Sequence, residues 1–281
     1  MIMYYALTES FKEQEKILVD MILKIAPVEQ IYILGSTLNQ RRTESIFMTG
    51  APSCRKVGHY YLLVLAGREM KYSYNDLQDR IENTSRSFIP VTAIVLGIEE
   101  FSKWVYEGHR FAQTVINAAV LLYGNDNSKS TGKSAGAAGQ KENSADYWTG
   151  EYNRVNEFIA GATLFILRQQ NKMAIFMLHQ ATEHALRSIF KKASGLHINT
   201  HNLDKLVRYC SILSYQIPDI FNRNNDKEER LFQLLQKAYI DTRYKQDFVV
   251  SKNDLEIILE KIKTLLKIMQ DARLNAGFKT E

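Results

Sequence analysis

Apolar residues recur at helical spacing in three stretches before residue 123. Residues 11–25 follow this spacing until Pro27 ends it, and residues 74–81 suit a second helix. A third helical stretch covers residues 101–122 and is broken near Gly108. It leads into a short apolar end at residues 121–123.

Three short apolar runs between these helices predict buried strands. They are IYILGS, HYYLLVLAG and IPVTAIVLG, at residues 31–36, 59–67 and 89–97. A few strands that alternate with helices are typical of a small α/β or α+β domain. We therefore predict a first domain over residues 1–123, built on a small mixed sheet.

Small and polar residues then dominate residues 124–145, where no large apolar side chain could anchor the chain. Such a composition predicts a flexible linker. The stretch contains GKS at residues 132–134, but it lacks the earlier glycine, the preceding strand and the following helix of a phosphate-binding loop. We therefore assign no site to it.

Residues 146–281 are predicted to be helical almost throughout. Five amphipathic patterns cover residues 148–166, 174–189, 203–213, 231–239 and 255–269. Gly195 is placed to end the second helix, and Ser251 with Asp254 forms a capping box ahead of the fifth. Long helices with short connections predict an up-and-down bundle.

Composition narrows the class of protein. A hydrophobic share of 45% and a charged share of 24% exclude disorder throughout, and two cysteines exclude a disulfide scaffold. No apolar run approaches the roughly 18 residues of a membrane span, and the N-terminus does not resemble a signal peptide. We expect a cytoplasmic protein without a membrane partner. The formal net charge of +5 is compatible with phosphate or nucleic acid as a ligand but does not require one.

Three separated blocks in the helical half resemble the HEPN family of helical-bundle domains. The matching residues are His179, Gln180, Ala181, Glu183, Ala185, Leu186, Thr200, His201, Leu203, Tyr239, Ile240, Arg243 and Tyr244. The blocks follow the family's order and together span roughly half the chain. The resemblance implies an all-α HEPN bundle over residues 146–281. Because such bundles are often dimeric in the family, it also implies a homodimer in which the C-terminal helices pack together.

The polar residues in these blocks allow two interpretations. Glu183 precedes Arg187 by four residues, which favours an ion pair on one helix face. In the structural interpretation, Glu183 also pairs with Arg243, and His201 caps a helix. In the functional interpretation, five residues contact a nucleotide or RNA: His179, Glu183, His201, Arg243 and Tyr244.

The cleavage motif of HEPN ribonucleases is missing. Many of those enzymes carry an arginine, four to six other residues, and then a histidine. Phe248, Val249 and Val250 occupy these distances after Arg243, and no other arginine has a histidine there. Metal-independent cleavage needs a general acid or base such as histidine. The resemblance therefore implies a HEPN domain without the usual motif, a type regarded as nucleotide-binding or as part of toxin–antitoxin systems.

The first domain resembles small nucleotidyltransferases of the DNA polymerase β type, which often accompany HEPN domains. Those enzymes have a strand ending in Gly-Ser, a strand with Asp-x-Asp, and a later strand with a third carboxylate. The carboxylates bind two magnesium ions that hold the triphosphate. Gly35 and Ser36 fit the Gly-Ser, and the runs at residues 59–66 and 91–96 fit the two other strands.

The three expected carboxylates are absent. His59, Tyr61 and Thr92 stand in their places, and the chain contains no Asp-x-Asp. None of these side chains offers an anionic oxygen to magnesium. We therefore expect a degenerate domain without a metal or another cofactor, in which Gly35, Ser36, His59, Tyr61 and Thr92 are at most nucleotide contacts.

Together these features predict a nucleotide- or RNA-binding protein rather than an enzyme, with a possible relation to toxin–antitoxin systems. The alternative is an active nucleotidyltransferase with Mg²⁺ as its cofactor and displaced ligands such as Asp76, Asp79 or Glu82. The bundle would then hold the acceptor substrate. A structural adaptor is a third possibility, which ligand screening by thermal shift would test.

Overall fold

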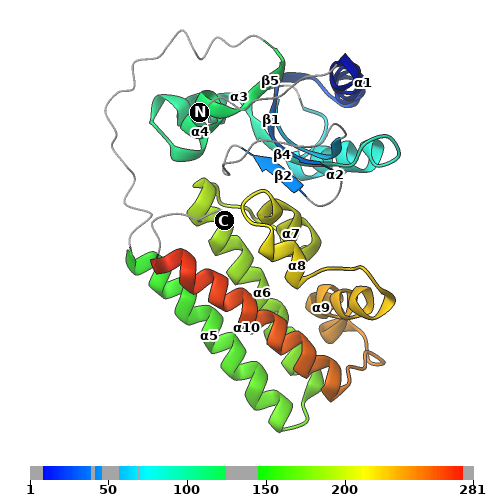
Figure 1. The fold of residues 1–281 in the computed structure, drawn as a ribbon, viewed down its shortest axis with the longest axis vertical. Coiled ribbons are helices and arrows are strands. Elements are labelled where there is room, and N and C mark those ends of the chain that lie inside the picture. The colour runs from blue at the N-terminus through cyan, green and yellow to red at the C-terminus, as the bar shows by residue number, and fades with distance from the viewer. Residues whose placement is uncertain (1–8, 39–41, 46–56, 69, 125–144, 275–281) are drawn as a thin grey trace. The chain divides into compact units, whose positions relative to one another are not determined.

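The computed structural model describes residues 9–38, 42–45, 57–68, 70–124 and 145–274 (Figure 1). The chain forms two compact units, Met1–Gln140 and Lys141–Glu281. The boundary between them falls within the segment that the sequence predicts as a linker. Residues 125–144, including the GKS tripeptide, lie outside the described residues, so the linker stays a prediction.

The first unit is built on a mixed five-stranded sheet. The order of strands is β2-β1-β3-β4, and β5 also pairs with β1. β1 runs antiparallel to β2, β3 and β5, whereas β3 and β4 are parallel. The strands are β1 Val28–Leu38, β2 Arg42–Ser45, β3 Val57–Ala66, β4 Val91–Gly97 and β5 Val120–Tyr123.

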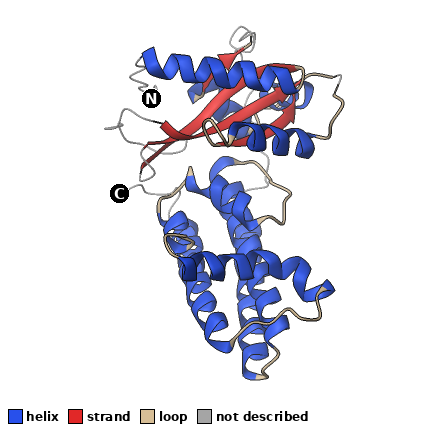
Figure 2. Cartoon of the chain, turned by 90° about the vertical axis from the view of Figure 1, so that its right-hand side faces the viewer, coloured by secondary structure: helices blue, strands red, loops and turns tan. Residues whose placement is uncertain are grey.

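Helices flank this sheet (Figure 2). They are α1 Glu9–Ile25, α2 Tyr74–Ser85, α3 Ile98–Tyr106 and α4 Arg110–Ala118. Because side chains alternate along a strand, β3 contributes to two apolar layers. Its residues Tyr60, Leu62 and Val64 belong to one buried cluster together with residues of α1 and α2. From β1, Tyr32 packs its ring 6.3 Å from that of Phe101 in α3.

The sequence predicts most of these elements. The helical break at Gly108 is confirmed, since this residue has a positive φ of 72° between α3 and α4. Two strands differ from the expectation. The apolar end at residues 121–123 is the strand β5, and β2 has no counterpart in the predicted pattern. The sequence of β2, RTES, has no apolar alternation that could mark a strand.

The second unit is a helical bundle centred on α6. Its helices are α5 Ala145–Leu167, α6 Asn171–Ser194, α7 Leu203–Ser211, α8 Gln216–Ile220, α9 Asp226–Tyr244 and α10 Lys252–Leu274. The helix α6 contacts α5, α7, α9 and α10. Its apolar positions Ala174, Leu178, Ala181, Ala185 and Ile189 have no exposed surface. The five predicted helices are all present, and the short α8 is additional.

Local signals fix the ends of two of these helices. Gly195 adopts a left-handed conformation with φ of 84° and donates its N–H to the carbonyl of Lys191, which ends α6. Ser251 Oγ accepts a hydrogen bond of 3.1 Å from the N–H of Asp254 ahead of α10. The predicted fold class is confirmed: an α+β protein with a mixed-sheet unit followed by an all-α unit.

The part of the chain that the structure describes contains no helix with both the length and the apolar character required to cross a bilayer.

Candidate functional site

The three positions where the first unit lacks carboxylates lie side by side in the sheet. Tyr61 of β3 is paired with Thr92 of β4, and His59 Nε2 lies 2.8 Å from Thr92 Oγ1. The rings of His59 and Tyr61 are 4.8 Å apart. Tyr61 and Thr92 are buried, with exposed fractions of 5% and 1%. The predicted grouping of these residues is therefore present, and their side chains contact one another.

Gly35 and Ser36 do not end their strand as the expected Gly-Ser would. β1 continues through both residues to Leu38, with Gly35 opposite Tyr61 and Ser36 opposite Tyr60. The strand β2 extends the ladder, because it pairs with β1 at Gly35 and Ser36. Ser36 is fully buried. The expectation of a strand end at Gly-Ser is thus wrong, since the chain pairs with β2 there instead of turning.

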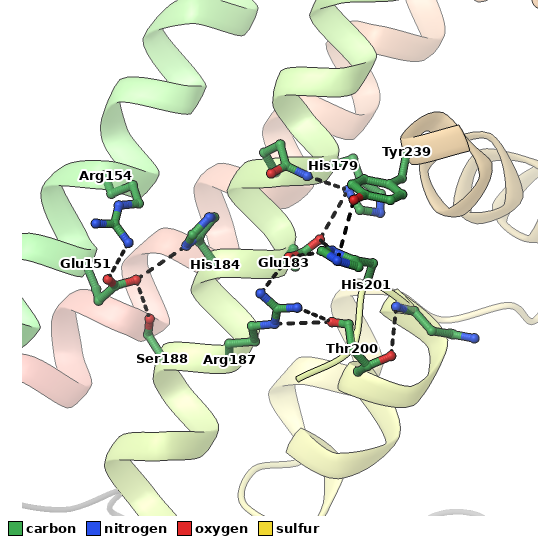
Figure 3. A network of polar contacts seen from close by, with 12 residues as sticks. Glu151, Arg154, His179, Glu183, His184, Arg187, Ser188, Thr200, His201 and Tyr239 are labelled. Carbon is green, nitrogen blue, oxygen red and sulfur yellow. Dashed lines mark hydrogen bonds and ion pairs between the residues drawn. The ribbon is translucent and has the colours of Figure 1, made fainter. Parts of the chain in front are cut away.

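The second candidate site is organised by a carboxylate buried on α6 (Figure 3). The side chain of Glu183 is only 2% exposed, and its Oε1 lies 2.8 Å from Nη1 of Arg187. Arg187 also donates two hydrogen bonds, of 2.6 and 3.2 Å, to the carbonyl of Thr200. A buried charge needs a partner of this kind, because desolvation strongly disfavours an isolated carboxylate. Glu183 and Arg187 therefore fasten the segment before α7 to α6.

The contacts of Arg187 with Glu183 and Thr200 also place the next residue, His201, beside the Glu183 carboxylate. His201 Nδ1 lies 3.0 and 3.1 Å from the two oxygens of Glu183, and half of the His201 side chain is exposed. Its ring stacks on that of Tyr239 in α9, with centroids 4.4 Å apart and an interplanar angle of 12°. A residue from the segment before α7 thus joins α6 to α9.

Arg243 extends this stack towards solvent. Its guanidinium carbon lies 4.3 Å from the centroid of the Tyr239 ring and 5.0 Å from that of Phe176. Arg243 is exposed and forms no ion pair with any described residue. The next residue, Tyr244, is 77% exposed. A cation and an aromatic ring are therefore available to a ligand at the end of α9.

A lysine from α6 anchors this end of α9. Lys172 Nζ donates hydrogen bonds of 3.1 and 2.6 Å to the carbonyls of Lys245 and Gln246, which directly follow the helix. Asn171 donates a bond of 2.8 Å to the carbonyl of Val250 further along. The turn after Arg243 and Tyr244 is thus held against the start of α6.

His179 lies on α6, one turn before Glu183. Its side chain has no exposed surface, and its Nδ1 lies 3.8 Å from Glu183 Oε2. Among the described residues, its Nε2 has no hydrogen-bond partner. Burial lowers the pKa of His179 from 6.5 to about 4, although the backbone of His201 has an opposing effect. His179 is therefore neutral near pH 7 and packs 5.4 Å from the Tyr239 ring.

Most of the residues expected at this site lie together, but two of their expected contacts differ in the structure. The structure joins His179, Glu183 and His201 directly and Arg243 through Tyr239, and it confirms the pair of Glu183 with Arg187. The expected ion pair of Glu183 with Arg243 is wrong, because Arg187 and His201 occupy the carboxylate. His201 does not cap α7; Asn202 does, by accepting from the N–H of Lys205.

The role of Tyr239 was missed. It appears in the family resemblance, but its spacing to Arg243 on α9 is the same as that of many helical neighbours. Only the fold shows that its ring contacts His179, His201 and Arg243. Tyr244, in contrast, was expected at the site. It is exposed, and among the described residues it forms no hydrogen bond or ring contact with Glu183 or His201.

A second polar cluster between α5 and α6 was also missed. Glu151 Oε2 lies 3.2 Å from Ser188 Oγ and 3.4 Å from His184 Nδ1, while Arg154 pairs with Oε1 at 2.7 Å. The hydrogen bond from His184 is the main cause that lowers the pKa of Glu151. The carboxylate is 11% exposed and its partners surround it, so this cluster joins two helices.

Within the described ranges, no three histidine, cysteine or acidic side chains are grouped as a metal site would require. Asp76 is hydrogen-bonded to Ser73 at the start of α2, and Glu82 accepts from the N–H of Ala93. These contacts engage two of the three acids named as displaced ligands.

The buried His179 predicts a specific loss of stability in acid. A folded-state pKa below the unfolded value means that the unfolded chain binds more protons. The contribution of His179 is complete above pH 6.5 and decreases as the pH falls towards 4. We expect His179→Leu to remove a decrease of up to about 3 kcal/mol over this range. The measurement is urea unfolding at several pH values, followed by Trp148 fluorescence in a Trp104→Phe background.

His197→Leu is the matched control, because His197 is exposed on the segment after α6. It should retain the acid dependence of the parent protein. An equal dependence in the His179→Leu variant would contradict the assignment.

Comparison with known proteins agrees with the geometry of the second unit. Residues 152–272 match the HEPN domain family. A nucleotidyltransferase-like protein from Exiguobacterium sibiricum 255-15, with a crystal structure at 1.90 Å resolution, is 11% identical. The similarity covers 94% of this chain and 78% of that one with a TM-score of 0.27, which is too low to support a conclusion. A search of curated proteins finds no significant match. The stretch that matches the HEPN domain family thus covers most of the helical unit and includes the Glu183–His201–Tyr239 cluster.

Proposed function

We propose that this protein binds a nucleotide or RNA at the surface formed by His201, Tyr239, Arg243 and Tyr244. The observation that carries the proposal is the position of Arg243. Its guanidinium stacks on Tyr239 and Phe176, is exposed, and makes no ion pair with a described carboxylate. A stacked guanidinium keeps its N–H groups in a plane, where they suit the oxygens of a phosphate.

Aromatic surface beside this cation supports the same ligand class. Tyr244, whose ring is exposed, directly follows Arg243 in the chain. The imidazole of His201 is half-exposed and stacks on the ring of Tyr239. Single-stranded nucleic acids and nucleotides bind to such surfaces through phosphate contacts and stacking of bases on rings. The excess of basic residues, with a formal net charge of +5, favours an anionic ligand.

Replacing Arg243 tests this proposal. We expect Arg243→Gln to weaken binding of a short single-stranded RNA by roughly 10-fold, because one charge-assisted contact to phosphate is lost. The dependence of log K on log salt should decrease by about 0.7, as expected when one phosphate contact to a single strand is removed. Fluorescence anisotropy at several salt concentrations measures both quantities.

Arg168→Gln is the matched control, since Arg168 is an exposed arginine just after α5. It should leave affinity and salt dependence nearly unchanged. Equal effects of the two substitutions would indicate only a general influence of net charge and would refute the site.

We propose in addition that the first unit is a nucleotidyltransferase-like domain that has lost catalysis. Support comes from His59, Tyr61 and Thr92, which occupy the carboxylate positions of the resemblance and contact each other in the sheet. A displaced set of acids would have to replace them, but Asp76 and Glu82 are already hydrogen-bonded elsewhere. The active nucleotidyltransferase is therefore the weaker alternative.

An assay of nucleotidyl transfer distinguishes the inactive domain from the active nucleotidyltransferase. We expect no transfer of label from α-³²P-ATP, or from the other three nucleoside triphosphates, to the protein, to RNA or to small acceptors in the presence of Mg²⁺. The reason is that magnesium needs anionic oxygens to hold a triphosphate in place. Mg²⁺-dependent transfer that copurifies with the protein would establish the active alternative.

The HEPN resemblance further suggests a homodimer and a role related to toxin–antitoxin systems, and we propose both. The exposed apolar side chains Leu164, Leu167 and Met173, on either side of the turn between α5 and α6, support contact between copies of the helical bundle.

Light scattering after size exclusion measures the mass of the particle in solution. We expect twice the mass of 32.4 kDa for the parent protein, and a smaller mass, closer to that of the monomer, for Leu167→Asp. A parent protein that remains monomeric at high concentration would contradict the dimer.

A further inference from the structure

The imidazole of His201 has one nitrogen committed to the protein. Nδ1 lies 3.0 and 3.1 Å from the oxygens of Glu183, and the carboxylate is also paired with Arg187. An ionised carboxylate only accepts hydrogen bonds, so Nδ1 must carry a hydrogen and donate it. In the neutral ring, the other nitrogen then has no hydrogen and is an acceptor. Glu183 thus determines the tautomer of His201.

The second nitrogen, Nε2, belongs to the exposed part of the site. The His201 side chain is 51% exposed. Tyr239 Oη lies 3.5 Å from Nε2, at the limit of a hydrogen bond, and the two rings are nearly parallel. A hydroxyl on a stacked ring lies outside the plane of the imidazole, whereas the lone pair of Nε2 lies in that plane. The contact with Tyr239 therefore leaves Nε2 able to accept from a ligand.

The phosphate and the sugar of a nucleotide differ in whether they can donate a hydrogen bond to Nε2 of His201. Phosphate oxygens are themselves acceptors and suit Arg243. The sugar of DNA has no hydroxyl within a strand, whereas each ribose of RNA carries a 2′-hydroxyl that can donate. Arg243 and His201 both contact the Tyr239 ring, at 4.3 and 4.4 Å, so a phosphate donor and a hydroxyl acceptor flank one side chain.

We infer that Glu183 and His201 make this site select ribose over deoxyribose. This inference rests on the proposed binding of a nucleotide or RNA. His201 contacts the 2′-hydroxyl directly, and Glu183 is a positioning residue that acts through the imidazole. A protonated ring would instead donate from Nε2 to a phosphate and would not distinguish the two sugars.

Matched ligands test the inference. The ligands are a hexamer of adenylate and a hexamer of deoxyadenylate with the same fluorophore, and AMP with dAMP as the mononucleotide pair. Binding is measured at about pH 8. We expect the ribose ligand to bind roughly 3- to 10-fold more tightly, as one hydrogen bond would provide. Preference in both pairs indicates a site for nucleotides in general, and preference in the hexamers alone indicates RNA.

Variants separate the preference from affinity. His201→Phe keeps a ring to stack on Tyr239 but has no nitrogen, so it should bind both sugars equally. Arg243→Gln should weaken both ligands and keep their ratio. Glu183→Gln, whose amide can face the imidazole with its oxygen or its nitrogen, should reduce the preference. The ¹⁵N chemical shifts of His201, assigned by difference with His201→Phe, should report hydrogen on Nδ1 in the parent and a mixture of tautomers in Glu183→Gln.

The possible failures are distinct. If no hexamer or mononucleotide binds, or if Arg243→Gln changes nothing, the proposed binding function is wrong and the inference falls with it. If both sugars bind equally to the parent protein, the ribose preference is wrong although the binding function stands. If His201→Phe retains the full preference, another group reads the sugar and the assignment to His201 is overturned.

Discussion

The helical unit depends on how a single carboxylate is neutralised. Glu183 lies on the central helix α6 with 2% of its side chain exposed, and a charge in that position requires strong partners. Arg187 supplies the opposite charge and also holds the carbonyl of Thr200, while His201 donates a hydrogen bond from Nδ1. The segment before α7 must therefore follow one path over α6. The stack of His201, Tyr239 and Arg243 is a consequence of that path.

The sequence predicts the helical unit well because its signals are local. Apolar spacing identifies the five long helices, Gly195 and Ser251 fix helix ends, and the interval from Glu183 to Arg187 identifies an ion pair. The partner of Arg243 could not be found in this way. It depends on which faces of α6 and α9 meet, and periodicity within each helix does not determine that.

The first unit shows the same limit for strands. The order of the apolar runs and the position of Thr92 beside Tyr61 follow from the expected mixed sheet. The extension of β1 through Gly35 and Ser36 does not, because it requires the short polar strand β2 as a partner. Hydrogen bonds between backbones stabilise β2, and these leave little trace in the choice of side chains. The Gly35–Ser36 dipeptide alone therefore does not determine where β1 ends.

Lys172 gives the exposed end of α9 an unusual property for a helix terminus. The chain at the C-terminus of a helix often frays, because the last carbonyls of the helix have no partner within it. Here one ammonium group from α6 binds the carbonyls of Lys245 and Gln246. The residues just before them are thus already ordered in the unliganded protein, so an incoming molecule would not have to immobilise backbone there. Little conformational entropy is lost at that step, and a small contact area can suffice for measurable affinity.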